Sequence, residues 1–212
     1  MIITLAWLAI TIAIAGLCAP VSDASGPAPE QALQQLLEGN ERFVEQRPIH
    51  PDARPSDAPQ HPLAVILSCS DSRVPPEIAF DQGVGTLFVV RVAGNTFDQL
   101  ALQSIQFAVS KLGTRLILVI GHDQCGAVSA AVKSYPNAHV GPMLQNIYPA
   151  VRATQKAQGD RVSAAIDANA ILIAERLRHD PELAELVHAG SLKILPARYN
   201  LATGKVRILP ET

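Results

Sequence analysis

The chain has few cysteines, a single tryptophan and no concentration of positive charge. Of its 212 residues, 17 are Lys or Arg and 19 are Asp or Glu, which gives a formal net charge of −2. No basic stripe and no basic patch interleaved with aromatic residues occurs along the sequence, so we expect no nucleic-acid partner. Internal repeats and a second block of distinct composition are also missing. The length therefore suits one domain with a full hydrophobic core.

Charge is absent from the start of the chain. Residues 2–19 carry no charged side chain and are almost wholly apolar, which is typical of the hydrophobic region of a secretory signal. Ser22 and Ala24 supply the small residues of a cleavage site, so we predict a signal peptide over residues 1–24 and export to the periplasm. The segment before the apolar run has no Lys or Arg, and the run just reaches the length of a membrane span. An uncleaved anchor is the alternative, and only then would the protein contact a membrane.

Cysteine is scarce in the predicted mature chain. Removal of the signal takes away Cys18 and leaves Cys69 and Cys125. Two cysteines in an exported protein can form a disulfide. Metal ligation is the better interpretation, because His122 accompanies Cys125 and a carboxylate, Asp71, accompanies Cys69.

Short apolar runs alternate with helical patterns along the rest of the chain. Strands are expected at 63–68, 87–90, 116–120 and 191–195, with an edge strand at 205–209. Helices are expected at 29–46, 97–112, 126–132, 141–158, 162–179 and from Pro181 onward, and a further helix should begin at 75–77. Buried strands that alternate with helices indicate a single α/β domain, with a mainly parallel central sheet flanked by helices and a C-terminal edge strand.

Three local features of these helices are also predicted. Gly39 and Asn40 should kink the first helix or end its first part. Asn95 or Thr96 should cap the helix over 97–112. Leu100 should lie on the apolar face of that helix.

Two short segments together contain the residue types of a zinc site. Cys69 directly follows the strand at 63–68, and His122 and Cys125 follow the strand at 116–120. A lone buried cysteine is usually a small hydrophobic residue. In an open α/β sheet, however, ligands bind beyond the carboxyl ends of the strands, so these segments should meet.

Two thiolates and one imidazole suit Zn²⁺ and leave one coordination position for water. Water bound to zinc can ionise near neutral pH and become a strong nucleophile. The pattern therefore predicts a zinc hydrolase or hydratase.

Longer stretches around these segments resemble the β-class carbonic anhydrases. The Cys-Ser-Asp-Ser-Arg segment at 69–73 and the His-x-x-Cys-Gly segment at 122–126 are highly specific in that order and separation. Further matching text lies at 39–43, 74–77, 85–95, 127–128 and 199–206. The resemblance spans about residues 30–209 and implies the β-carbonic anhydrase fold for the predicted mature chain, residues 25–212.

The resemblance also implies an activity and its cofactor. One Zn²⁺ per chain would be held by Cys69, His122 and Cys125. Zinc-bound hydroxide would then hydrate CO₂ reversibly to bicarbonate and a proton. Two alternatives stay open: a hydrolase of a CO₂ analogue such as carbon disulfide or carbonyl sulfide, and a zinc- or bicarbonate-binding protein without turnover.

Asp71 and Arg73 have predicted catalytic roles. A carboxylate two residues after Cys69 can reach the metal or accept a hydrogen bond from its water, and Arg73 can pair with it in bidentate fashion. In the family this pair gates the site, because an Asp that swings onto zinc removes the open position. The alternative is a plain surface ion pair, which would contribute little.

The resemblance places further residues near the substrate. Gln60 lies nine residues before Cys69, where plant-like members place a glutamine that hydrogen-bonds the substrate. Phe88 and Ala93 are expected to line the apolar CO₂ pocket. Core packing explains these three residues equally well. Gly126 is expected to allow close backbone approach behind the metal, near a helix N-terminus that favours anions.

The resemblance finally implies assembly into a homodimer or homotetramer. Phe107 falls where many members have an aromatic residue that reaches across the dimer interface, and the helix over 29–46 should pack on a neighbouring subunit. Ile66 occupies the position where some bacterial members carry a tryptophan of an inhibitory bicarbonate pocket. Together with Gln60, this indicates the constitutively open subtype.

Overall fold

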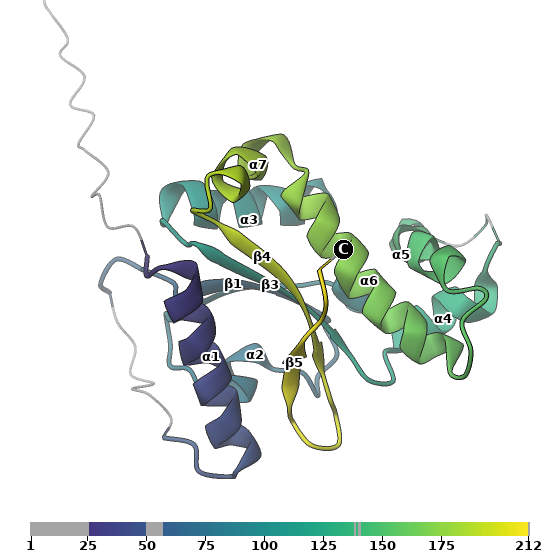
Figure 1. Ribbon diagram of the computed structural model, residues 1–212, viewed down its shortest axis with the longest axis horizontal. Helices are drawn as coiled ribbons and strands as arrows, with labels where there is room; N and C mark the ends of the chain where they lie inside the picture. Colours follow the sequence, from purple (N-terminus) through teal and green to yellow (C-terminus); the bar gives the residue numbers. More distant parts are fainter. Residues whose placement is uncertain (1–25, 50–56, 138, 140, 212) are drawn as a thin grey trace, which may run out of the picture.

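The described part of the chain folds into three layers. The computed structural model describes residues 26–49, 57–137, 139 and 141–211, so the predicted signal peptide lies outside the described residues. A five-stranded sheet lies between two layers of helices (Figure 1). None of the helices in these ranges has the length and apolar character needed to cross a membrane.

The sheet has the strand order β2-β1-β3-β4-β5. Its strands are β1 (Ala64–Ser68), β2 (Leu87–Arg91), β3 (Leu116–His122), β4 (Lys193–Tyr199) and β5 (Val206–Ile208). The pairs β1–β2, β1–β3 and β3–β4 are parallel, and β5 runs antiparallel to β4. The predicted mainly parallel sheet with a C-terminal edge strand is therefore confirmed.

Seven α-helices and one 3-10 turn surround the sheet in the described ranges. They are α1 (Pro29–Val44), α2 (Pro76–Ala79), η1 (Ala93–Asn95), α3 (Gln99–Lys111), α4 (Gly126–Ser134), α5 (Pro142–Ala153), α6 (Arg161–Arg178) and α7 (Pro181–His188). Figure 1 shows α3, α6 and α7 on one face of the sheet and α1 with α2 on the other. The pair α4 and α5 packs together beyond one end of the sheet.

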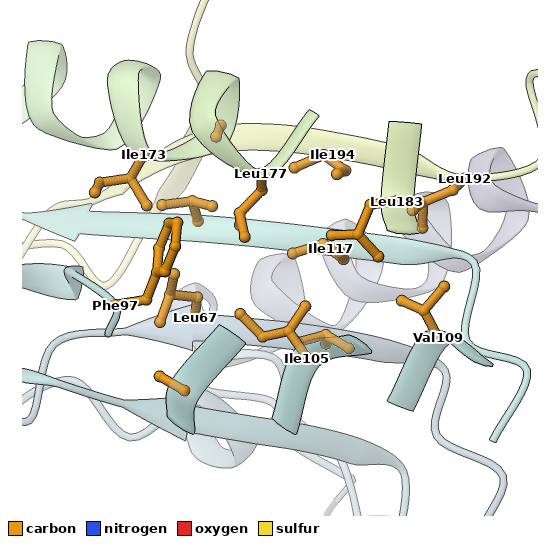
Figure 2. Packing of buried hydrophobic residues seen from close by; sticks show 14 of the residues in the cluster. Leu67, Phe97, Ile105, Val109, Ile117, Ile173, Leu177, Leu183, Leu192 and Ile194 are labelled. Atoms are coloured by element: carbon orange, nitrogen blue, oxygen red, sulfur yellow. The ribbon is translucent and has the colours of Figure 1, made fainter. Parts of the chain in front are cut away.

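Both faces of the central strands are buried, which explains why their sequences are continuous apolar runs. On one face, Leu67 of β1 and Ile117 of β3 pack against Ile105 of α3 and Ile173 of α6 (Figure 2). The opposite face of β1 and β3 packs against α1 and α2. The edge strand β2 is only half buried, so the prediction of a buried strand there is wrong for the single chain.

Strand β4 differs most from its prediction. It covers Lys193–Tyr199 instead of 191–195, and Pro196 lies inside it. A proline normally argues against an interior strand because it cannot donate to the ladder. The N–H and C=O of a strand residue point to the same side, and the Pro196 carbonyl accepts from the Leu209 N–H on the β5 side. The missing N–H therefore removes no hydrogen bond to β3.

Helix α3 corrects two expectations. Its N-cap is Asp98, whose carboxylate accepts a hydrogen bond from the Ala101 N–H, while Asn95 and Thr96 belong to the preceding buried turn. Leu100 is 73% exposed, so it does not lie on the apolar face. It precedes the buried Ile105 by five residues, which turns it about 140° away around the helix.

Helix α1 continues through Gly39 and Asn40 without the predicted break. An added Cβ at Gly39 would lie 1.9 Å from the Phe80 carbonyl oxygen, so glycine allows the helix to touch that backbone. Asn40 donates to the carbonyls of Ala79 and Gly204 at 2.8 Å each, and its side-chain oxygen accepts from the Val206 N–H. These two residues join α1 to α2 and β5.

This contact generates a stability prediction. We expect Gly39→Ala to lower the free energy of unfolding by about 2 kcal/mol through overpacking. The direction of the change in stability tests the contact, because without it alanine would be favoured over glycine in the helix by about 1 kcal/mol.

Urea denaturation followed by circular dichroism measures the change at one protein concentration. Gly141→Ala is the control, because nothing lies within 4 Å of its added Cβ. A Gly39→Ala variant as stable as the unmodified protein would contradict the contact.

Candidate metal centre

Three potential ligands meet at the carboxyl ends of β1 and β3. Cys69 directly follows β1, His122 is the last residue of β3, and Cys125 is the N-cap of α4. Their ligand atoms all lie within 4.8 Å of one another, and all three side chains are buried. The predicted meeting of the two sequence segments is therefore present in the structure.

The orientation of the His122 ring leaves one nitrogen for a ligand. Nδ1 lies 2.8 Å from the Asp123 carbonyl oxygen, and a carbonyl can only accept, so Nδ1 carries the proton. Nε2 is buried and has no hydrogen-bond partner among the described residues. A buried polar atom without a partner is costly. A metal on the Nε2 lone pair would satisfy it, as is usual for a histidine oriented through its other nitrogen.

The two cysteines are free thiols. A hydrogen bond from the Cys125 thiol is the largest cause that lowers the pKa of Cys69, and the Gly94 N–H lowers it further. The same bond raises the pKa of Cys125, and burial raises it further. One proton is thus shared between two sulfurs, and a divalent cation would replace it. Two sulfurs and one imidazole nitrogen are the donors that zinc prefers, so these residues fit the ion.

Asp71 lies beside this cluster and is held by Arg73. The Arg73 guanidinium donates to Oδ1 at 2.9 Å and to Oδ2 at 2.8 Å, and the Arg73 backbone N–H also donates to Oδ1. These bonds hold the pKa of Asp71 well below its usual range. Oδ2 lies 3.9 Å from His122 Nε2, so the carboxylate faces the cluster.

Two arginines that the sequence analysis did not single out support the site. Arg91, at the end of β2, donates to the carbonyls of Cys69 and Asp71 and so fixes the loop after β1. Arg198 of β4 binds the side-chain carboxylate of Asp123. The backbone carbonyl of the same Asp123 orients His122. Arg198 was missed because the predicted strand ended at residue 195.

The residues predicted to contact the substrate differ in how near they lie to the ligand cluster. Ala93 begins η1, which carries the Gly94 N–H to Cys69. Phe88 is half buried in β2 and packs against the core cluster shared with α3. Gly126 is the first residue of α4, but nothing lies within 4 Å of an added Cβ, so this chain shows no close approach there.

Gln60 lies at the other end of β1. It precedes that strand, whereas Cys69 follows it. Gln60 lines a pocket of about 510 Å³ together with Val84 and Thr86, and none of the three potential ligands lines this pocket. A single chain therefore does not bring Gln60 to the metal cluster.

Comparisons with known proteins agree with this geometry. The family model described as carbonic anhydrase matches residues 64–206. Carbonic anhydrase 2 of Mycobacterium tuberculosis is 39% identical over 192 residues, which cover 84% of this chain and 91% of that protein. The carbonic anhydrase of Mycolicibacterium smegmatis is 37% identical over 192 residues, which cover 85% of this chain and 93% of that protein.

Solved structures show the same fold. The β-carbonic anhydrase CcaA superposes with a TM-score of 0.64 at 23% identity, over 84% of this chain and 95% of that one. A Coccomyxa β-carbonic anhydrase gives 0.63 at 22% identity, over 85% of this chain and 82% of the other. The present chain belongs to the β-carbonic anhydrase family and is an enzyme of that class.

The geometry predicts metal binding by these three ligands. We expect about one zinc per chain, and we expect Cys125→Ala to lose the metal together with part of the unfolding free energy, because ligation and folding are coupled. Since the raised pKa keeps a proton on Cys125 around neutral pH, binding must release it. Affinity should therefore increase about tenfold per pH unit for one released proton.

Competition with a chromophoric chelator at several pH values measures both effects. Val128→Ala, a buried change in the same helix, controls for general destabilisation and should keep the metal. Full zinc in Cys125→Ala would disprove the ligand assignment.

Proposed function

We propose that this enzyme hydrates CO₂ reversibly to bicarbonate and a proton with one Zn²⁺ per chain, held by Cys69, His122 and Cys125. The observation that carries this proposal is the buried His122 Nε2, which has no hydrogen-bond partner in the described part of the chain and lies within 4.8 Å of two buried sulfurs. A zinc ion bound there would supply a Lewis acid and a water that ionises near neutral pH.

Asp71 would orient the attacking water in this reaction. A carboxylate with a strongly lowered pKa is ionised at neutral pH and can only accept hydrogen bonds. Arg73 occupies both of its oxygens from one side, and Oδ2 faces His122 on the other. Asp71 can therefore accept a hydrogen bond from water beside the cluster while Arg73 restrains it from turning toward the ligands.

The lowered pKa of Asp71 also excludes one role. A carboxyl group that releases its proton so readily cannot store the proton that hydration of CO₂ liberates. The proton must therefore pass from the site to buffer by another route. Asp71 serves as an orienting acceptor, and Arg73 serves to fix its position.

Two other functions use the same residues. Hydrolysis of carbon disulfide or carbonyl sulfide needs the same activated water and differs in access to the pocket. A zinc- or bicarbonate-binding protein without turnover would not need an oriented carboxylate, and the Asp71–Arg73 pair is present with bidentate geometry. The pair therefore favours an enzyme.

Assembly into a homodimer or homotetramer is part of the proposal. Phe107 and Leu100 of α3 are 48% and 73% exposed, and the neighbouring edge strand β2 is half exposed. Such a combined apolar surface on a strand edge favours burial against a second copy. A second subunit could also bring its Gln60 to the metal cluster, which the same chain does not do. A solved relative from Sordaria macrospora is described as tetrameric.

Export stays a proposal that rests on the uncharged apolar run at residues 2–19. The predicted cleavage after Ala24 and the periplasmic location follow from that run and from the small residues after it. The uncleaved membrane anchor is the alternative.

The activity is tested by stopped-flow hydration of CO₂, with zinc quantified on the same sample. We expect turnover that rises from weakly acidic to alkaline pH, because ionised water is the nucleophile. Asp71→Ala should keep its zinc but lose about a hundredfold in kcat/KM, since the ligands stay while the water loses its orienting acceptor.

Asp57→Ala, in the loop before β1, is the matched control and should retain full activity. Zinc-loaded protein without CO₂ turnover at any pH would reject the proposed reaction, and carbon disulfide would then be the substrate to test. Loss of zinc from Asp71→Ala would reject the orienting role.

Export and assembly are tested together on protein expressed with its full sequence. Intact mass spectrometry should give a chain that begins at Ser25, and sedimentation of that product should give the mass of a dimer or tetramer. A chain that retains residues 1–24 in the membrane fraction would favour the anchor. A monomer would contradict the proposed assembly.

A further inference from the structure

The Cys69 sulfur accepts a backbone hydrogen bond from outside its own loop. The Gly94 N–H lies 3.2 Å from Cys69 Sγ, and both residues are buried. A hydrogen bond to a thiolate withdraws electron density from the sulfur, so it changes how strongly that sulfur donates to a metal. The position of this one N–H therefore matters for the metal centre.

Glycine 94 does not hold this position by its own conformational preference. Its φ is 72°, in the left-handed region, and the next residue, Asn95, has a φ of 46°. An added Cβ at Gly94 would lie 2.7 Å from Cδ1 of Ile147, so any other residue would have to displace that side chain and hold a strained φ. A glycine has more backbone freedom than any other residue. Some contact must therefore restrain the backbone on the carbonyl side of Gly94, so that its N–H keeps its direction.

That contact comes from helix α6. The side-chain Nδ2 of Asn169 donates to the Gly94 carbonyl oxygen at 2.8 Å. Asn169 is 1% exposed and is the polar member of the buried face of α6, between Ile166 and Ala170. A buried amide in an apolar face is expensive unless it is hydrogen-bonded. Apolar packing alone would be served better by leucine or alanine, so the amide has a positional role.

We propose that Asn169 is a positioning residue for the metal centre, which acts by holding the Gly94 N–H on the sulfur of Cys69. The Nδ2 bond holds the peptide that follows Gly94, and the hydrogen bond from the Asn95 N–H to the Val92 carbonyl closes the turn around it. Together these bonds limit the backbone torsions of Gly94 and so the direction of its N–H. Helix α6 thereby tunes one ligand without touching the metal. This inference rests on the proposed ligation of zinc by Cys69.

The test substitutes Asn169→Leu, which is close in size to asparagine and removes the donor without adding a carboxyl group that could take up a proton and donate to the same carbonyl. Cobalt(II) replaces zinc as the probe, because its thiolate-to-metal charge-transfer band reports on the sulfur. Loss of the N–H bond raises the energy of the sulfur lone pairs, so the band should move to longer wavelength. Zinc affinity, measured by chelator competition, should fall about tenfold.

Ile173→Val on the same helix is the matched control. It removes a methylene group one turn further along α6, in the core cluster that does not include Cys69 or Cys125, so it should lower thermal stability without moving the band or the affinity. If Asn169→Leu does not fold, Asn169→Ala takes its place under the same criteria. An unshifted band together with unchanged zinc affinity in a folded Asn169 variant would overturn the positioning role.

The unmodified protein separates the two proposals. If it binds cobalt without a thiolate band, the ligation by Cys69 is wrong and the proposed function falls with it. If it shows the band and the Asn169 variants show the same band and affinity, only the positioning role is wrong.

Discussion

The parallel pairing of β1 and β3 is the constraint on which the rest of the molecule depends. Its register sets Ser68 opposite Ile120, so the residues that follow each strand emerge side by side. Cys69 and His122 are thereby brought together although two helices, a strand and a 3-10 turn separate them in the chain. Parallel pairing requires burial on both faces, and the two layers of helices supply it.

The sheet could be predicted because its signal is strong and local. The runs of β1 and β3 are apolar throughout, and helical patterns separate them, which leaves few arrangements other than a parallel sheet. The ligand cluster followed from the rule that strand ends share an edge. Pro196 shows what such reasoning could not predict, namely that β4 continues through a proline. A proline argues against a strand unless the direction of its missing N–H is known, and that direction depends on pairing with β5.

The supporting residues were beyond a reading of the sequence. Arg91, Arg198 and Asn169 act on the site through carbonyl and carboxylate groups of other residues, and nothing in their local sequence marks such a contact. Asn169 is preceded and followed by residues typical of any helix. Gln60 shows the reverse situation, because a position suggested by resemblance lies far from the cluster within one chain.

The ligands also come from two well-separated parts of the chain. A metal bound by both Cys69 and His122 would cross-link the two ends of a chain segment that contains α2, β2, η1 and α3. Closing such a loop in the unfolded chain removes conformational entropy, in the way a disulfide does. The edge strand and its helix would then be tethered at both ends. The free metal concentration would thus set the stability of β2 and α3 against local unfolding as well as the occupancy of the site.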